Sequence, residues 1–351
     1  MYRNHKIALV IPAYNEEKLI GPTLRSVSPE IDQIYVVDDC STDKQNEVIQ
    51  EIAKADRRVT LIRHEFNQGP GGGIITGYRK ASQDGCDIAL VVGGDHQMNL
   101  QEARNFLDPI IEGVADYTKG NRFVLSKLEE TIAKMPRIRL FANWIITALT
   151  KIASGYFGVM DVVDGYTAIH KRVIDTISWE KAWKGYGYPM DFLVRLNAYG
   201  FRVLDVPRTA IYLVGERQSQ IKGIRYAMTV APMLFRAFLW RLRFKYVYLD
   251  FHPLVLFYYV SFLLVPLGLC MGTYLVFDRL FLGGFGVTAS RSILVALILT
   301  TGFQFFLFAM YFDREESKAW SHWWRTYYLG GKKRETDLVS DQTVSGAVCE
   351  K

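Results

Sequence analysis

Short apolar runs alternate with amphipathic stretches over the first ninety or so residues of the chain. The apolar runs predict strands at residues 6–12, 33–37, 59–63 and 88–92. The stretches between them predict helices at residues 16–26, 43–55 and 73–82. Strands that alternate with helices in this way are typical of a mostly parallel sheet covered on both faces. We therefore expect an α/β fold for this part of the chain.

The pattern is less regular between residues 99 and 215. It predicts helices at 100–112, 137–153 and 190–199, and strands at 166–169 and 202–206, the last of which ends at Pro207. We find no internal repeat and no low-complexity linker in this stretch. Residues 1–220 are therefore assigned to a single α/β domain.

Two long runs without any charged residue follow, at 253–277 and 293–312. Their lengths of 25 and 20 residues are enough to cross a bilayer as tilted helices. A buried core helix is the alternative for either run, but two such runs in tandem favour a transmembrane hairpin. We assign this hairpin to residues 251–313.

Basic residues are concentrated just before the hairpin, although the formal net charge of the whole chain is only +6. Between Arg217 and Leu249 there are seven Lys or Arg residues, interleaved with aromatic ones, and no Asp or Glu. This pattern is typical of a helix that lies on an anionic membrane surface, here residues 221–250. Nucleic-acid binding is the competing interpretation, and the adjacent membrane runs argue against it.

The distribution of charge also predicts a topology. The loop between the two runs, residues 278–292, carries only two arginines, whereas both flanks are rich in Lys and Arg. The positive-inside rule then places the α/β domain, both termini and the tail of residues 314–351 in the cytoplasm. The four scattered cysteines fit a reducing compartment, and the N-terminus has too short an apolar stretch for a signal peptide. We expect a multi-pass protein of the cytoplasmic membrane, and a hairpin with a basic belt would also suit a homo-tetramer.

Four polar loops follow the predicted strands, and ligands of open α/β sheets bind at the carboxyl ends of strands. The loops read IPAYNEE, VVDDCSTD, NQGPGGG and GGDHQM. The acid pair Asp38 and Asp39 suits the hydroxyls of a ribose or the edge of a base. Asp95 is a lone carboxylate directly after a buried strand, for which an ordinary turn is the alternative.

The glycine cluster at residues 69–73 resembles a phosphate loop but fits neither standard pattern. GxGxxG fails at Ile74 and Thr76, and GxxxxGK[ST] is absent from the sequence. The cluster more plausibly lets the backbone pass close to a ligand and opens a helix whose N-terminal amides favour an anion. A flexible surface loop is the alternative.

Taken in order, PAYNEE, VVDDCSTD, NQGPGGG and GDHQM resemble the GT-A glycosyltransferases of family 2. The membrane runs narrow the resemblance to the polyprenyl-phosphate and dolichyl-phosphate sugar transferases. It covers residues 6–222 and the hairpin, and it implies a Rossmann-like GT-A catalytic domain followed by interfacial helices. The residues that it implies for nucleotide binding are Pro12, Ala13, Tyr14, Glu16, Asp39, Gly71 and Asp95.

The resemblance further implies a divalent metal, Mg²⁺ or Mn²⁺, at Asp95 and Gln97, which match the end of the family's DxDxQ motif. This chain departs from the family at Gly93, where the first acid of the motif is usual. A hard cation takes oxygen ligands from substrate phosphates and water as well as from protein. One protein carboxylate is therefore sufficient in principle.

Several basic residues and one serine match family segments that would hold the phosphate of an acceptor, because guanidinium groups bind phosphate oxygens at two points. These acceptor candidates are Arg122, Arg137, Arg139, Arg217, Ser219 and Lys222. For Arg217, Ser219 and Lys222, binding of the donor diphosphate is the alternative. A solvated helix face is the alternative for Arg137 and Arg139. The segment DVVDGYTAI places Asp161 and Asp164 near the reacting centre, and Asp191 stands where the family often has Glu.

The implied reaction is the inverting transfer of a sugar from a UDP- or GDP-linked donor to undecaprenyl or dolichyl phosphate. Asp95, Asp161 and Arg122 are the catalytic candidates. The acceptor phosphate is already ionised at neutral pH, since its second pKa is about 6, so a strong general base is less necessary. Asp161 would orient or deprotonate the acceptor, with a structural turn residue as the alternative. Two other functions stay open: transfer to another lipid or to a polysaccharide, and a non-catalytic, membrane-tethered nucleotide-sugar-binding scaffold.

Overall fold

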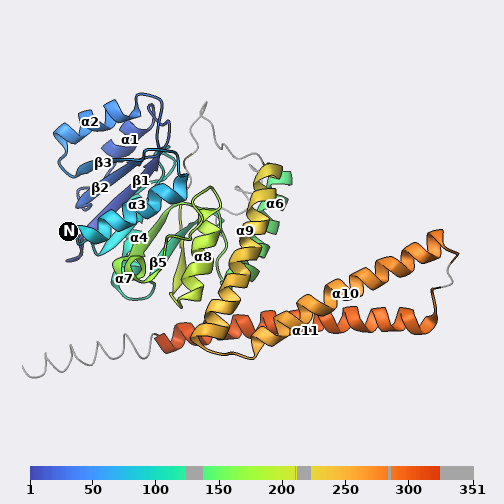
Figure 1. Cartoon of the computed structure of the whole chain (residues 1–351). Coiled ribbons are helices and arrows are strands. Elements are labelled where there is room, and N and C mark those ends of the chain that lie inside the picture. Colours follow the sequence, from blue (N-terminus) through green and yellow to red (C-terminus); the bar gives the residue numbers. More distant parts are fainter. Residues whose placement is uncertain (124–136, 210, 212–222, 284–285, 325–351) are drawn as a thin grey trace, which may run out of the picture. The chain divides into compact units, whose positions relative to one another are not determined.

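The computed structural model describes residues 1–123, 137–209, 211, 223–283 and 286–324 (Figure 1). At residues 137–140, 223–225, 227 and 318–324 it describes the backbone alone. The described chain falls into two compact units, of which the first contains Met1–Phe238 and the second Leu239–His322.

The first unit is built on a mixed, mostly parallel sheet. Its strands are β1 (Ile7–Ala13), β2 (Gln33–Asp38), β3 (Val59–Arg63), β4 (Ile88–Val91), β5 (Tyr117–Asn121), β6 (Thr167–His170) and β7 (Val203–Pro207). They lie in the order β3-β2-β1-β4-β6-β5-β7. Strand β6 is antiparallel to both of its neighbours, and the remaining pairs are parallel.

Helices cover both faces of this sheet (Figure 1). The helices along this part of the chain are α1 (Ile20–Arg25), α2 (Gln45–Ala55), α3 (Pro70–Gln83), the short 3₁₀ turn Leu100–Glu102, α4 (Ala103–Ile111), α6 (Arg137–Ser154), α7 (Lys171–Thr176), α8 (Tyr188–Ala198) and α9 (Gly223–Arg243). Side chains alternate between the two faces of a strand. Leu9 of β1 therefore joins the apolar cluster of Ile20 and Phe106. Val10 lies under α3, where a β-carbon at Gly77 would lie 2.1 Å from the Val10 Cγ1.

The register of the strands decides which loops meet. Ala13 at the end of β1 lies opposite Asp38 at the end of β2. Val91 at the end of β4 lies opposite Thr167, which begins the antiparallel β6. The carboxyl ends of the parallel strands and the start of β6 thus share one edge, which we call the strand-end edge.

The α/β fold class expected from the sequence is confirmed, with differences in detail. Helix α3 begins at Pro70 and not at residue 73, because proline is well suited to the first position of a helix. Helix α1 begins at Ile20 and not at residue 16. Strand β5 and helix α7 were not predicted, because neither YTKGN nor KRVIDT has a clear apolar period.

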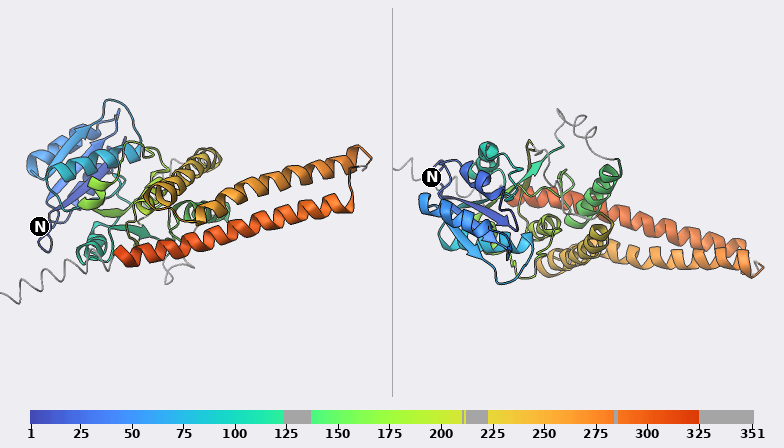
Figure 2. Two further views of the ribbon diagram at one scale, coloured as in Figure 1. Left: turned by 60° about the horizontal axis from the view of Figure 1, so that its bottom comes forward. Right: turned by 90° about the horizontal axis from the view of Figure 1, so that it is seen from above.

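The second unit contains a π-helical turn, Phe244–Leu249, and two long helices, α10 (Leu254–Phe281) and α11 (Ala289–Trp324). Within the described residues, Leu254–Phe281 and Ala289–Ser317 are long and apolar enough to cross a membrane, each with a mean hydropathy of 2.2. The two helices run side by side (Figure 2). Small residues bring them close, since a β-carbon at Gly268 would lie 2.7 Å from the Leu299 Cδ2.

A buried ion pair links two elements of this unit. The Arg241 guanidinium donates to both carboxylate oxygens of Asp313, at 3.0 and 2.6 Å, and both side chains are fully buried. Tyr246 and Tyr258 also donate hydroxyl hydrogen bonds to Asp313, at 2.5 and 3.3 Å. Arg241 is therefore not one of the membrane-facing cations that its basic stretch suggested, because Asp313 binds it inside the protein.

Candidate active site

The first two strand-end loops are hydrogen-bonded to each other. The Asp39 amide donates to the Ala13 carbonyl at 3.0 Å, and the Asn15 amide donates to the Ser41 hydroxyl at 3.0 Å. In return, the Asn15 side chain accepts a hydrogen bond from the Thr42 amide at 2.9 Å. Asn15 has a positive φ of 57°, a strained conformation that is common in functional loops. The PAYNEE and DDCSTD motifs therefore form one rigid surface.

Asp38 is fully buried and organises its own loop. Its carboxylate accepts hydrogen bonds from the Ser41 amide at 3.0 Å, from Gln45 at 3.1 Å and from Asn46 at 2.9 Å. Arg63 adds an ion pair at 3.3 Å. The repulsion expected between Asp38 and its neighbouring acid is offset by these donors. Asp38 therefore fixes the conformation of the second strand-end loop from a buried position.

Asp39 holds the third loop in place. One of its oxygens accepts from the His64 Nδ1 and from the Gln68 amide, both at 2.8 Å, and the other accepts from the Gly69 amide at 2.7 Å. The other ring nitrogen of His64 lies 2.9 Å from the Thr76 hydroxyl. Asp39 therefore connects the second strand end to the glycine cluster, and its role as a nucleotide ligand stays a prediction.

The sequence analysis expected the glycine cluster to let the backbone pass close to a ligand. In the structure, this backbone passes close to another segment of the protein. The Gly71 amide donates to the Lys184 carbonyl at 2.7 Å, and a β-carbon at Gly71 would lie 2.7 Å from the Trp183 carbonyl oxygen. Gly69 has a positive φ of 85°. Residues 183–188 thus explain why glycine is needed at position 71. The predicted contact of Gly71 with a nucleotide is not tested by these distances.

The fourth loop, which carries Asp95, packs on the first. A β-carbon at Gly94 would lie 3.2 Å from the Ala13 Cβ, and the Thr23 hydroxyl donates to the Gly94 carbonyl. A β-carbon at Gly93 would lie only 2.9 Å from the Asp95 Oδ1. The absence of the usual first acid is therefore consistent with the position that the Asp95 carboxylate takes up.

The surroundings of Asp95 suit a cation that takes most of its ligands from the bound substrate. Burial raises the pKa of Asp95, against the opposing effect of backbone donors such as the Gln97 amide at 3.3 Å. A cation would stabilise the ionised form of such a carboxylate. In the part of the chain that the structure describes, no group of three or more His, Cys, Asp or Glu could hold a metal ion. Mg²⁺ typically binds through one or two carboxylates, substrate phosphates and water.

His96, which the sequence analysis did not select, is strained and incompletely bonded. Its φ is 54°, and its buried Nδ1 has no hydrogen-bond partner among the described residues. Backbone strain and unsatisfied polar atoms in native proteins are concentrated at functional sites. Both features lie beside the carboxylate that would hold the metal.

Arg122 and two acids form a second charged group at the strand-end edge. The Arg122 Nε lies 2.6 Å from the Asp161 Oδ2 and 3.2 Å from the Asp164 Oδ2, and its Nη2 donates to the Asp161 Oδ1 at 3.0 Å. Burial alone would raise the pKa of Asp161, but the charge and hydrogen bonds of Arg122, with the charge of Lys119, hold it below the ordinary value. Asp161 is thus an ionised partner of Arg122 in this structure.

Arg208 lies at the candidate site and was not selected from the sequence. Its Nε donates to the Asp164 carboxylate at 2.7 Å, and its Nη1 donates to the Gln97 carbonyl at 3.4 Å. It therefore joins the metal-motif loop to the DVVDG segment. The signal that would have found it is its position directly after Pro207, at the carboxyl end of β7.

The remaining predicted residues are placed only in part. Arg137 and Arg139 lie in the first turn of α6, but their side chains lie outside the described residues, as do Arg217, Ser219 and Lys222 entirely. Tyr14 is 38% exposed at the strand-end edge. Asp191 is buried and bonded to Arg195 at 2.8 Å and to the Trp183 amide at 2.9 Å, so it caps a turn inside the fold.

Helix α6 carries an exposed apolar stripe. Four of its side chains are between 37% and 66% exposed, namely Phe141, Trp144, Ile145 and Leu149. Their spacing places them on one face of the helix, and the rings of Phe141 and Trp144 stack at 6.4 Å. A stripe of this kind on a helix typically contacts a membrane or another protein.

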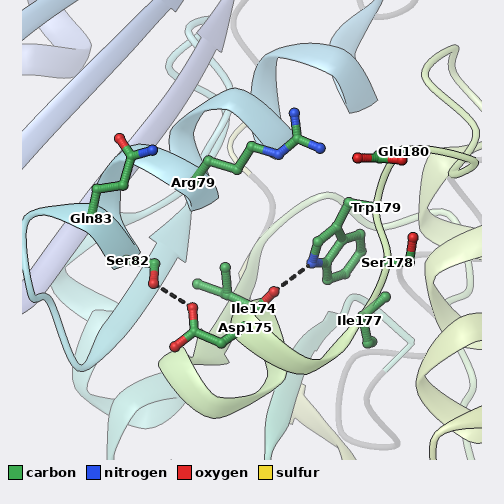
Figure 3. Close-up of a pocket in the computed structure, with 9 residues that line it drawn as sticks. All are labelled: Arg79, Ser82, Gln83, Ile174, Asp175, Ile177, Ser178, Trp179 and Glu180. Carbon is green, nitrogen blue, oxygen red and sulfur yellow. Dashed lines mark hydrogen bonds between the residues drawn. The ribbon is translucent and has the colours of Figure 1, made fainter.

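A surface pocket of about 290 Å³ lies elsewhere, between the end of α3 and the segment that follows α7 (Figure 3). It is lined by Arg79, Ser82, Gln83, Ile174, Asp175, Ile177, Ser178, Trp179 and Glu180. Within it, Ser82 is bonded to Asp175, and the Trp179 indole donates to the Ile174 carbonyl at 3.0 Å. None of the predicted site residues lines this pocket, so we place the candidate site at the strand-end edge.

Comparisons with known proteins identify the family that this chain resembles. The family model of Glycosyl transferase family 2 matches residues 8–178. The chain is 29% identical over 219 residues to a UDP-N-acetylglucosamine–dolichyl-phosphate N-acetylglucosaminyltransferase of Methanococcus voltae, covering 59% of this chain and 86% of that protein. It is 28% identical over 212 residues to an undecaprenyl-phosphate mannosyltransferase of Micrococcus luteus, covering 59% and 84%.

The fold is also found among solved structures. The crystal structure of glucosyl-3-phosphoglycerate synthase from Mycobacterium tuberculosis in complex with phosphoglyceric acid superposes with a TM-score of 0.50. That match covers 68% of this chain and 80% of the synthase, at 16% sequence identity. At this identity the likeness shows a shared fold.

Proposed function

Because the chain belongs to glycosyl transferase family 2, we propose that it transfers a sugar from a UDP- or GDP-linked donor to a polyprenyl phosphate in the membrane. The transfer inverts the configuration of the anomeric carbon. The relatives named for dolichyl-phosphate and undecaprenyl-phosphate acceptors support a lipid phosphate as the acceptor class.

One observation carries this proposal: the strand-end edge brings a carboxylate suited to a cation together with an arginine suited to a phosphate. Arg208 connects the two, since it contacts both the Asp95 loop through Gln97 and Asp164, which also pairs with Arg122. A donor diphosphate at Asp95 and an acceptor phosphate at Arg122 would then lie on one surface. This is the arrangement that a displacement between two phosphorylated substrates requires.

The nucleotide half of the site would be formed by Pro12, Ala13, Tyr14, Glu16, Asp39 and Gly71. Asp95 and Gln97 would hold Mg²⁺ or Mn²⁺, which as a Lewis acid supplies stabilisation of the negative charge on the leaving diphosphate. These residues come from the first two loops, the glycine cluster and the fourth loop. The hydrogen bonds among the loops fix their geometry before the donor arrives.

The acceptor half depends on Arg122. A phosphate oxygen of the acceptor attacks the anomeric carbon from the face opposite the diphosphate, and Arg122 orients that phosphate through charge-assisted hydrogen bonds. The phosphate is ionised at neutral pH, since its second pKa is about 6. Asp161 therefore acts by holding Arg122, and no proton needs to leave the nucleophile. Arg137, Arg139, Arg217, Ser219 and Lys222 would add further phosphate contacts.

The acceptor lipid requires a site at the membrane surface. The apolar stripe of α6, with Phe141 and Trp144, would enter the interface of the bilayer, and α10 and α11 would cross it. The excess of positive charge on both flanks of the hairpin supports a cytoplasmic catalytic domain and cytoplasmic termini. The chain would thus work at the inner face of the cytoplasmic membrane.

The test is an incubation of membranes containing the protein with labelled UDP- and GDP-sugars and polyprenyl phosphate. We expect an acid-labile labelled glycolipid in the presence of Mn²⁺ and none in the presence of a chelator. Asp95→Ala should abolish its formation, and Glu51→Ala, an exposed acid on α2, should not. Nucleotide-sugar binding without any lipid product would support a non-catalytic scaffold and contradict the proposal.

A further inference from the structure

Residues 183–188 follow Trp179 in the chain and lead into α8. They lie against the glycine cluster. The Lys184 carbonyl accepts from the Gly71 amide at 2.7 Å, and the Lys184 ammonium donates to the Gln68 side chain at 2.7 Å. Asp39 in turn accepts from the amides of Gln68 and Gly69. The segment is therefore attached to the loop that Asp39 holds at the strand-end edge.

Helix α9 secures the same segment from the other side. A β-carbon at Gly187 would lie 2.8 Å from the Met233 Cε and 3.2 Å from the Val230 Cγ2, so the helix packs directly on this glycine. The Tyr226 hydroxyl donates to the Tyr186 carbonyl at 3.5 Å. The backbone of residues 183–188 is thus held between the glycine cluster and α9 by contacts that do not involve the ring of Tyr186.

Tyr186 is nevertheless 50% exposed. Its neighbour Gly185 packs on the glycine cluster, since a β-carbon at Gly69 would lie 3.2 Å from the Gly185 Cα. The Gly69 amide donates to Asp39 at 2.7 Å, so Tyr186 lies one residue from a contact with the loop that Asp39 holds. Burial raises the pKa of Tyr186, and the charges of Glu16, Asp39 and Tyr14 raise it further, in agreement with this placement. Tyr14 is itself 38% exposed. Two accessible aromatic rings thus lie at the donor half of the site, and only Tyr14 belongs to a recognised motif.

We propose that Tyr186 is a donor-binding residue whose ring stacks on the base of a nucleoside diphosphate, beside Tyr14. The inference rests on the proposed function, because it places the nucleotide at this edge. Aromatic side chains stack on all bases, since every base has a π-face. Such a contact suits either uracil or guanine and strengthens binding of the base without reading its identity. A ring with a purely structural role would instead be expected inside the fold.

The inference is tested by the binding of UDP and GDP to the full-length protein in detergent micelles, measured by calorimetry. Tyr186→Leu should raise the dissociation constant of the nucleotide about tenfold, which corresponds to the loss of one stacking contact. Tyr186→Phe keeps the ring and should stay close to wild type. Tyr248→Leu, which removes a tyrosine that is 74% exposed in the second unit, is the matched control and should change nothing.

Inorganic pyrophosphate separates stacking from a general loss of structure. Pyrophosphate has no base, so its own dissociation constant, obtained from its competition with the nucleotide, should be the same for wild type and Tyr186→Leu. An unchanged nucleotide affinity in Tyr186→Leu would overturn the inference, as would a parallel loss of pyrophosphate binding. A wild-type protein that binds neither UDP nor GDP would overturn the proposed function together with the inference.

Discussion

Arg122 and Asp161 face each other in a two-point ion pair, with the Arg122 Nε 2.6 Å from Oδ2 and its Nη2 3.0 Å from Oδ1. The arginine side chain is 22% exposed and the aspartate is fully buried. Part of the guanidinium therefore remains exposed although it is paired with the acid. If an acceptor phosphate binds Arg122 as proposed, this pair would fix the direction from which the phosphate approaches.

Replacing Arg122 with Leu should destabilise the protein, because it leaves the buried Asp161 charge without its main partner. Removal of one partner of a buried pair commonly costs about 3–5 kcal/mol. Since the pKa of Asp161 is held below its ordinary value, the stabilisation is present at neutral pH and is lost as the pH falls through the lowered pKa. Thermal unfolding at pH 7 and at acid pH measures the difference between the two proteins, which should shrink in acid. A difference independent of pH would contradict this account.

Asp95→Asn should separate stability from activity. Because burial raises the pKa of Asp95, the folded state favours the protonated acid, and this contribution to stability is lost as the pH rises through that pKa. At neutral pH the amide variant should therefore melt at the same temperature as wild type or higher, while its turnover is abolished. Calorimetry and an assay of turnover measure the two effects.

Gly71→Ala should weaken the attachment of residues 183–188. The new β-carbon would lie 2.7 and 2.9 Å from the carbonyl oxygens of Trp183 and Lys184, and backbone atoms cannot rotate away. Overpacking of this kind typically costs about 1–3 kcal/mol. We expect a lower melting temperature and a weaker affinity for nucleotide. Gly158→Ala is the control, because no atom lies within 4 Å of a β-carbon at that position.

Trp144→Glu should impair the use of long-chain lipid acceptors. Trp144 is 66% exposed on the apolar stripe of α6, and a charge there would oppose entry into the bilayer interface. The KM for polyprenyl phosphate in vesicles should rise, whereas turnover of a short, water-soluble isoprenyl phosphate should not change. Trp144→Phe should behave like wild type. Equal losses with both acceptors would point to a defect inside the α/β domain.

The second unit offers a test of its buried ion pair. Asp313→Leu alone removes the carboxylate that pairs with the fully buried Arg241 and should destabilise the protein by about 3–5 kcal/mol. The double variant Arg241→Met with Asp313→Leu removes both charges and should recover much of that loss. Thermal unfolding in detergent would show it. If the double variant were less stable than the single one, the pair would not be the source of the effect.

The first four strands could be predicted from the sequence because each is a buried apolar run, and their loops carry the recognisable motifs. Strand β5 could not, because its residues include Lys119, which is fully buried between neighbouring strands. A buried lysine is tolerated there through the nearby charges of Asp161, Asp164 and Asp205, which raise its pKa against the effect of burial. This compensation for the burial of Lys119 depends on tertiary structure, so it leaves no local sequence pattern from which β5 could be predicted.

The candidate site, like the sheet, could be predicted from the sequence only in part. Asp39, Asp95, Arg122 and Asp161 could be selected from their motifs, whereas the pairing of Arg122 with Asp161 and the role of Arg208 could not. Arg122 pairs with an acid 39 residues away, and Arg208 pairs with one 44 residues away. The contact between Gly71 and Lys184 likewise depends on two segments that only the fold brings together. Sequence motifs pointed to candidate residues here, but not to the contacts between segments that are distant in the chain.

The antiparallel direction of β6 has a consequence for how this protein could acquire new substrates. The chain leaves the strand-end edge after β5 and comes back to the same edge at the start of β6, so the segment between them begins and ends at that edge. Under the proposed function, a change within this segment would alter the acceptor half and leave strands β1 to β4 in place. Evolution could therefore change the acceptor without changing the donor-binding residues, through substitutions in the single segment between β5 and β6.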